Sequence, residues 1–332
     1  MRTAAWTTAL VAVFLMAGCE RPPMDTTQTG FRGTAMGRVE NPRIKAAQPV
    51  QAAPAALPGA PSEGPKASET MQNVKVLGDL SVAEFTRTMQ AMTEWVSPKE
   101  GCAYCHDLQN LAADTKYTKV VSRRMLEMTR QVNSGWKSHV AGTGVTCFTC
   151  HRGQNVPTQV WFKGTGKTNS FAGNRAGQNA PARSVAYASL PNDPLSTFLV
   201  KDAAEIRVAG ANALPASGKH GASVKQAEAS FGLMMHMSQS LNVNCTFCHN
   251  TRSFDNWRES TPQRLTAWHG IRMARELNAS FLEPLTGTFP ANRLGPSGDV
   301  AKVSCATCHQ GLNKPLGGAA MAAAYPALTP AP

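Results

Sequence analysis

One short motif occurs four times in this chain: two cysteines separated by two residues, with a histidine directly after the second cysteine. The motif cysteines are Cys102 and Cys105, Cys147 and Cys150, Cys245 and Cys248, and Cys305 and Cys308. This C-x-x-C-H arrangement is the attachment motif of c-type haem. Its two thiols can reach both vinyl groups of one porphyrin, and the histidine then lies under the iron. Four copies predict four covalently bound c-type haems, with one axial ligand each from His106, His151, His249 and His309.

The N-terminus is typical of an exported bacterial protein, and residues 1–18 are predicted to be a signal peptide. Its apolar run, residues 9–16, is too short to span a bilayer. The sequence Met16-Ala17-Gly18-Cys19 resembles a bacterial lipobox, which predicts Cys19 as the lipidated first residue of the mature protein. The alternative is an ordinary signal peptide, or an uncleaved anchor, with an incidental cysteine. Zinc is the competing interpretation of the C-x-x-C pairs. It is disfavoured, because a zinc site needs neither a histidine after each pair nor an export signal.

Composition and motif spacing divide the rest of the chain. We expect residues 19–70, rich in Pro, Ala and Gly, to form a lipidated arm or tether, which could be flexible or could dock on a partner. The predicted units that follow are a first two-haem unit at 71–160, a connector at 161–215, a second two-haem unit at 216–315 and a flexible tail at 316–332. The formal net charge is +12, but no basic run is interleaved with aromatic residues. Ionised propionates of four haems would add about −8, so no nucleic-acid partner is predicted.

A helix is expected before each motif, which predicts a mainly α fold with extensive loops. Ser81 and Glu84 form a capping box that opens the first helix, and Ser97-Pro98 closes it. The second is expected over about 116–133 and the third over about 222–241. Thr261 is the predicted N-cap of the fourth, with proline at its first position, and that helix is expected to reach about residue 278.

The two halves of the chain resemble each other. The second motif of each pair reads CFTCHRGQNVP or CATCHQGLNKP, and these share C-x-T-C-H-x-G-x-N-x-P. The first motif of each pair has an aromatic residue before its second cysteine. The agreement outside the haem ligands predicts a multihaem cytochrome built from a duplicated two-haem unit of helix, loop and C-x-x-C-H motif.

The distal iron ligands are sought on the four helices, where methionines recur at i and i+3. The pairs are Met89 and Met92, Met125 and Met128, Met234 and Met237, with Gly270 and Met273 in the fourth helix. Both members of a pair share one helix face, so periodicity cannot choose between them, and both could be core packing. Because the second methionine occurs in all four helices, it is assigned to packing. We therefore predict Met89, Met125 and Met234 as distal ligands of haems one to three, while Gly270 leaves room for a different ligand at haem four.

Four histidines outside the motifs could serve haem four: His139, His220, His236 and His269. His236 follows Met234 by two residues and points away from that ligand face. His269 lies about 100° round the helix from Gly270. Residue spacing alone leaves the choice open, and any of the four could be an ordinary surface or core histidine.

Over about residues 70–315 the chain resembles the tetrahaem cytochrome subunit of photosynthetic reaction centres from purple bacteria. The resemblance rests on the four motifs and their uneven pairing, the string LMMHMSQSLNVNCTFCHN, the lipobox and the missing fourth methionine. It implies three haems ligated by His and Met, and one ligated by two histidines. The second histidine precedes the second motif, and the matching position here is His139.

The resemblance also implies a function and a location. The chain would be lipid-anchored at the periplasmic face of the bacterial inner membrane, on the L and M subunits. It would re-reduce the photo-oxidised special pair of bacteriochlorophylls, with electrons from a soluble cytochrome c or a high-potential iron–sulfur protein. The alternative is a membrane-tethered multihaem cytochrome that serves a different oxidoreductase complex. A multihaem reductase is disfavoured, because two protein ligands on every iron leave no position for a substrate.

Overall fold

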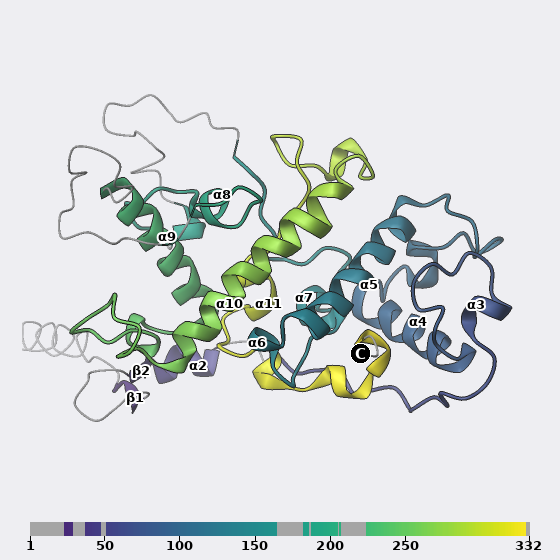
Figure 1. The fold of residues 1–332 in the computed structure, drawn as a ribbon, viewed down its shortest axis with the longest axis horizontal. Coiled ribbons are helices and arrows are strands. Elements are labelled where there is room, and N and C mark those ends of the chain that lie inside the picture. The colour runs from purple at the N-terminus through teal and green to yellow at the C-terminus, as the bar shows by residue number, and fades with distance from the viewer. Residues whose placement is uncertain are drawn as a thin grey trace, which may run out of the picture.

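The computed structural model describes residues 23–28, 37–47, 51–164, 182–185, 187–204, 206 and 224–329. Cys19 and His220 lie outside these residues. The described part is mainly helical with long loops, as predicted (Figure 1). Its α-helices are α2 (Pro42–Ala47), α3 (Ala67–Thr70), α4 (Val82–Val96), α5 (Tyr117–Gly135), α6 (Lys137–Val140), α7 (Cys147–His151), α8 (Pro194–Phe198), α9 (Val224–Leu241), α10 (Pro262–Glu276) and α11 (Cys305–His309). Strands β1 (Asp25–Gln28) and β2 (Gly37–Glu40) pair antiparallel, with Asp25 opposite Glu40.

Helix α4 begins and ends where its sequence predicts. The Ser81 hydroxyl accepts a hydrogen bond from the Glu84 amide at 3.1 Å, and the Glu84 carboxylate accepts from the Ser81 amide at 3.3 Å. Ser97 is the C-cap, since the residue before a proline disfavours helical geometry. Thr88, Ala91 and Trp95 are buried along one stripe, the pattern of a helix with one face on a core.

The other long helices also lie close to their predicted ranges, with two differences at α10. Thr261 occupies the N-cap position, but its hydroxyl donates to the Phe247 carbonyl at 2.7 Å instead of capping the helix. The chain then continues beyond α10 as a π-helical turn, Leu277–Leu282. Within the described residues, no helix is both long enough and apolar enough to cross a bilayer.

The helices form two groups that meet through the motif helices. Helices α4 and α5 lie at one end of the molecule, and α9 lies towards the other end with the β1–β2 hairpin (Figure 1). Helix α7 packs against α4, and α11 packs against α9. Helices α7 and α11 also contact each other, so the second and fourth motifs lie side by side between the groups. The first and third motifs form single 3₁₀ turns, η1 (Gly101–Tyr104) and η4 (Cys245–Phe247).

Part of the predicted N-terminal tether, around residues 57–61, is packed on the body of the protein. The guanidinium of Arg87 donates to the carbonyls of Pro58, at 2.6 Å, and Leu57, at 2.8 Å. The Ser81 hydroxyl donates to the carbonyl of Pro61 at 2.6 Å. Arg87 thus fixes an extended segment that lacks regular structure of its own.

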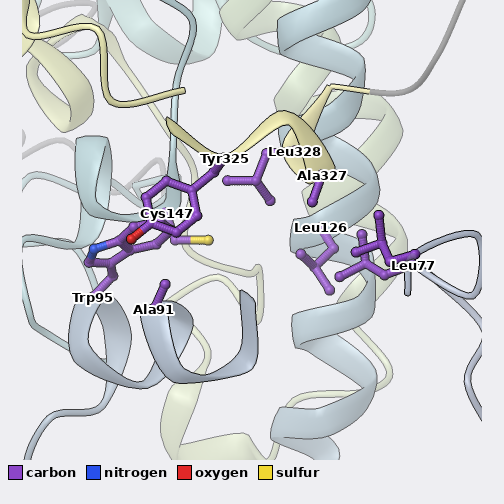
Figure 2. Close-up of a cluster of buried hydrophobic side chains, with 9 residues drawn as sticks. Leu77, Ala91, Trp95, Leu126, Cys147, Tyr325, Ala327 and Leu328 are labelled. Atoms are coloured by element: carbon purple, nitrogen blue, oxygen red, sulfur yellow. The ribbon is translucent and has the colours of Figure 1, made fainter. Parts of the chain in front are cut away.

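The C-terminal segment differs from the predicted flexible tail, because its described residues enter the core. Tyr325 is 1% exposed and Leu328 is 0% exposed. The Tyr325 ring meets Trp95 of α4 edge to face, with ring centroids 4.7 Å apart (Figure 2). Leu328 joins the same cluster, which also contains Leu126 of α5. Scattered apolar residues among Ala and Pro supply this burial without the periodicity that would have revealed it in the sequence.

The connector makes the complementary contact with the other helix group. Leu195, Phe198 and Leu199 pack against Leu233 of α9 and Ile271 of α10. The connector follows the second motif, and the tail follows the fourth. The connector thus follows α4 and α5 in sequence but packs on α9 and α10. The tail follows α9 and α10 in sequence but packs on α4 and α5.

Candidate haem-binding sites

The eight motif cysteines are free thiols in the structure. In α7 and α11 the two cysteines are three residues apart in one helical turn, so both lie on one face. The two turns begin alike, since the Thr146 amide donates to the Thr149 hydroxyl at 3.0 Å and the Ser304 amide donates to the Thr307 hydroxyl at 2.9 Å. Each turn thus presents two thiols and a histidine from one short, hydrogen-bonded unit, as covalent haem attachment requires.

All four motif histidines engage Nδ1 with a backbone carbonyl of the following loop. The pairs are His106 with Leu111 at 3.0 Å, His151 with Gln154 at 2.8 Å, His249 with Phe254 at 2.9 Å and His309 with Leu312 at 2.8 Å. A neutral imidazole that donates from Nδ1 keeps its Nε2 lone pair for a metal. The loops after the motifs therefore orient each ring and leave Nε2 available to a metal, a feature that the motif pattern did not reveal.

Burial favours the neutral form of three of the candidate ligand rings, His139, His151 and His309. It lowers the pKa of His309 to about 4, and it lowers the pKa values of His151 and His139 below their ordinary range. A histidine must be neutral to bind a metal. Low dielectric surroundings therefore favour the protonation state that iron ligation needs.

The structure brings His139 of α6 to His309 of the fourth motif. Their ring centroids are 6.1 Å apart, with the planes inclined at 65°. Metal–imidazole bonds are about 2 Å long, so two imidazoles on opposite sides of one metal have ring centres roughly 6 Å apart. Nδ1 of His139 bonds to the Thr266 carbonyl of α10 at 2.9 Å, which leaves its Nε2 free. The pair therefore fits a single iron between the two rings.

Gly270 of α10 lies directly against His139. A β-carbon at position 270 would stand 2.5 Å from Cε1 of His139 and 2.9 Å from its Nδ1. The imidazole thus occupies the space that a side chain at this position would need. The prediction that Gly270 leaves room for another group matches this arrangement.

The remaining described histidines have other surroundings. Nε2 of His236 lies 3.3 Å from the Ser240 hydroxyl on its own helix. His269 meets Trp268 edge to face, with ring centroids 4.9 Å apart. Among the described histidines outside the motifs, only His139 makes a ring contact with a motif histidine.

The packing of the methionines separates some of the i and i+3 pairs. Met273 is buried with Val132 and Leu277, and Met128 packs against them, as the packing assignment predicts. Met125 lies outside that cluster. In the first helix, however, Met89 and Met92 both border the Trp95 cluster, and in the third Met234 and Met237 both border the Leu233 cluster. For these two helices packing does not distinguish the members of a pair.

The second and fourth motifs bond to each other reciprocally. Arg152 donates to the Cys308 carbonyl at 3.2 Å, and Gln310 donates to the Cys150 carbonyl at 3.3 Å. A hydrogen bond to Cys308 raises the pKa of the Cys150 thiol, and burial raises it further. The two motifs therefore meet at close range.

Equivalent positions in the two helix groups make equivalent hydrogen bonds. The Gly153 amide donates to the Trp95 carbonyl at 2.9 Å, and the Gly311 amide donates to the Ser240 carbonyl at 2.8 Å. Two asparagines form a second matched set. Each exchanges two hydrogen bonds with the backbone of the valine that stands two residues before a motif. These sets are Asn133 with Val145 and Asn278 with Val303.

Comparison with known proteins matches this chain to one family. The family model of the photosynthetic reaction centre cytochrome C subunit matches residues 20–329. The photosynthetic reaction center cytochrome c subunit of Rubrivivax gelatinosus is 58% identical over 335 residues, covering 100% of this chain and 91% of the relative. That of Thermochromatium tepidum is 55% identical, covering 96% and 78%. That of Roseobacter denitrificans is 42% identical, covering 91% and 84%.

Proposed function

Because this chain belongs to the photosynthetic reaction centre cytochrome c subunit family, we propose that it holds four c-type haems and re-reduces the photo-oxidised special pair. Membership of this family carries several properties with it. The chain is an electron-transfer subunit of a photosynthetic reaction centre, it is an electron carrier and not an enzyme, and it carries covalently bound haem c. Its work is done in association with the photosynthetic membrane.

Each proposed iron has two protein ligands. The motif histidines His106, His151, His249 and His309 bind one face, and the distal ligands are Met89, Met125, Met234 and His139 in the same order. The eight motif cysteines, two for each haem, form the thioether bonds. The observation that carries this proposal is the facing pair of His139 and His309, held by Gly270 and the Thr266 carbonyl.

Bound haem supplies one-electron iron chemistry, with a higher potential when the distal ligand is Met than when it is His. The protein supplies fixed ligands on both faces, and it orients each proximal ring through a carbonyl acceptor. With both axial positions filled by protein, substrates have no vacant coordination site. This arrangement suits an electron carrier.

We further propose that the chain is a duplicated two-haem unit. The support is the repetition of local bonding at equivalent positions, namely the glycine amides after the second and fourth motifs and the asparagines before them. The exchange of trailing segments would then complete two similar cores. The bond from His139 to the fourth haem would link the two units through one iron.

The proposed partners are the L and M subunits with their special pair, and a soluble cytochrome c or high-potential iron–sulfur protein as donor. Cys19 is proposed as the lipid anchor at the periplasmic face of the inner membrane. The matched family and its named relatives support the reaction-centre partners.

Flash spectroscopy on membranes that contain the intact complex tests the function. A flash should oxidise haem, seen as bleaching of the α-bands, and the soluble donor should then restore them. Haem that stays reduced after the flash would favour the alternative, a membrane-tethered cytochrome that serves a different oxidoreductase complex. Haem quantification should give four per chain, and three in Cys305→Ala/Cys308→Ala.

A further inference from the structure

Lys119 of α5 is a buried cation, only 6% exposed. Its Nζ donates to three consecutive carbonyls of the loop after the first motif, those of Leu111 at 2.8 Å, Ala112 at 2.8 Å and Ala113 at 2.9 Å. An ammonium group has three protons to donate, and burying it is costly unless they are bonded. Lys119 meets this requirement, because each of the three carbonyls accepts a hydrogen bond from its Nζ.

The Leu111 carbonyl is also the acceptor for His106. Nδ1 of His106 lies 3.0 Å from this oxygen, and Nζ of Lys119 lies 2.8 Å from it. One oxygen atom therefore joins the buried cation to the proximal ring of the first motif. The loop geometry that orients the ring depends on Lys119.

We propose, resting on the proposed ligation by His106, that Lys119 is a positioning residue that raises the reduction potential of the first haem. A fixed positive charge in a region of low dielectric disfavours the more positive, oxidised iron. Lys119 also engages the carbonyl that accepts from His106, which weakens that acceptor and lowers the basicity of the ring. Both effects favour reduced iron.

The neighbouring carboxylate does not cancel this charge. Asp114 lies 3.2 Å from Lys119, but it also pairs with Arg123 at 2.9 Å and with Lys75 at 3.7 Å. The hydrogen bond from Arg123 is the main cause that holds the pKa of Asp114 well below its ordinary range. One carboxylate thus serves three cations, and the cluster keeps a net positive charge beside the first motif.

The third motif offers an internal comparison. His249 bonds to the Phe254 carbonyl in the same way, and Arg264 stands six residues before Gly270, as Lys119 stands six before Met125. Arg264, however, donates to the Ser260 hydroxyl at 2.7 Å and to the Asp255 carbonyl at 3.4 Å. Arg264 therefore bonds to the carbonyl next to the one that His249 engages, whereas Lys119 bonds to the same carbonyl that His106 engages.

A dark redox titration of Lys119→Met in the intact complex tests the proposal, with each haem followed by its α-band. At fixed ambient potential we expect the reduced-to-oxidised ratio of the first haem to fall about tenfold, which is about 59 mV for one electron. The other three haems should change less than about twofold. Lys75→Met is the matched control, because Lys75 pairs with the same Asp114 from a side chain that is 62% exposed. Its effect on the first haem should be small.

An unchanged first haem in a Lys119→Met protein with full haem content would overturn the proposal, and so would an equal shift in Lys75→Met. If Lys119→Met loses haem, Asp114→Asn decides the question. That variant removes the negative charge and should raise the potential of the first haem, so an unchanged potential there rejects the idea. The titration needs no light, and a failure of flash oxidation in the unaltered complex would count against the proposed function alone.

Discussion

His139 and Gly270 fit together only because Gly270 has no side chain. The imidazole of His139 lies where a β-carbon would stand, and the two residues are 131 positions apart in sequence. The same ring faces His309 of the fourth motif. The missing side chain at Gly270 therefore leaves the space that His139, the proposed ligand of the fourth haem, occupies.

Gly270→Ala should displace His139, because a methyl group 2.5 Å from Cε1 cannot be accommodated without movement. We expect the fourth haem to lose its bis-histidine spectrum by electron paramagnetic resonance, while the other three keep theirs. Gly287→Ala is the control, since a β-carbon there meets nothing within 4 Å. An unaltered fourth haem in Gly270→Ala would contradict the ligand assignment.

His139→Met should raise the potential of the fourth haem, because a Met ligand favours reduced iron relative to His. The expected shift is on the order of 0.1 V, a fraction of the roughly 0.8 V that axial ligands span. The other three potentials should stay nearly constant in a redox titration. A combined Gly270→Met/His139→Ala variant should give the fourth haem His/Met ligation. Its methionine would stand at the position proposed to supply the distal ligand in the three sister helices. A shift confined to a different haem would exclude His139.

Met125→Leu and Met128→Leu form a matched test of the i and i+3 pairs. Both changes conserve volume and should cost less than about 1.5 kcal/mol of stability. Only Met125→Leu removes the proposed sulfur ligand, so only this variant should give a five-coordinate, high-spin second haem by absorption spectroscopy. High-spin haem in Met128→Leu alone would reverse the assignment.

Tyr325→Ala should release the C-terminal segment. The ring packs against Trp95 and under the Arg87 guanidinium, and its hydroxyl accepts from the Leu57 amide at 3.0 Å. Removing a large buried ring costs about 3–5 kcal/mol, so urea should unfold the variant at lower concentration and proteases should cleave its tail. Tyr187→Ala, at a residue that is 65% exposed, should leave both measurements unchanged.

Asn278→Leu should destabilise the backbone at Val303, which leads into the fourth motif. The buried Asn278 amide accepts from the Val303 amide at 2.8 Å and donates to the carbonyls of Val303, at 3.0 Å, and Leu199, at 2.8 Å. Each buried group left without a partner costs about 1–3 kcal/mol. Hydrogen exchange of the Val303 amide should accelerate, whereas Asn292→Leu, at an exposed position, should have no such effect.

Local signals made the helices and the motifs predictable from the sequence. Ser81 and Glu84 mark the start of α4, and Ser97-Pro98 marks its end. Long-range contacts were harder to foresee. The approach of α6 to α10 brings His139 to Gly270 and to His309, and residue spacing alone could not supply that contact. Likewise, the sequence does not distinguish Lys119 from an ordinary helical lysine. Its contacts with the loop after the first motif are seen only in the structure.

The buried tail was unpredictable for a different physical reason. Tyr325 and Leu328 stand among Ala and Pro residues, with no period that marks a helix or strand. Their burial depends on a surface that α4 and α5 present only after those helices have paired. Composition therefore indicated a mobile segment where tertiary packing holds a fixed one.

The packing of the C-terminal segment also bears on the order in which the protein assembles. Cys147 lies in the same buried cluster as Tyr325, so the finished core covers one of the two thiols proposed to hold the second haem (Figure 2). Chains are made from the N-terminus, and their early segments begin to fold first. Tyr325 follows Cys147 by 178 residues, so it joins the folding chain later. We expect the proposed attachment of the second haem at Cys147 to precede the docking of Tyr325 on this core.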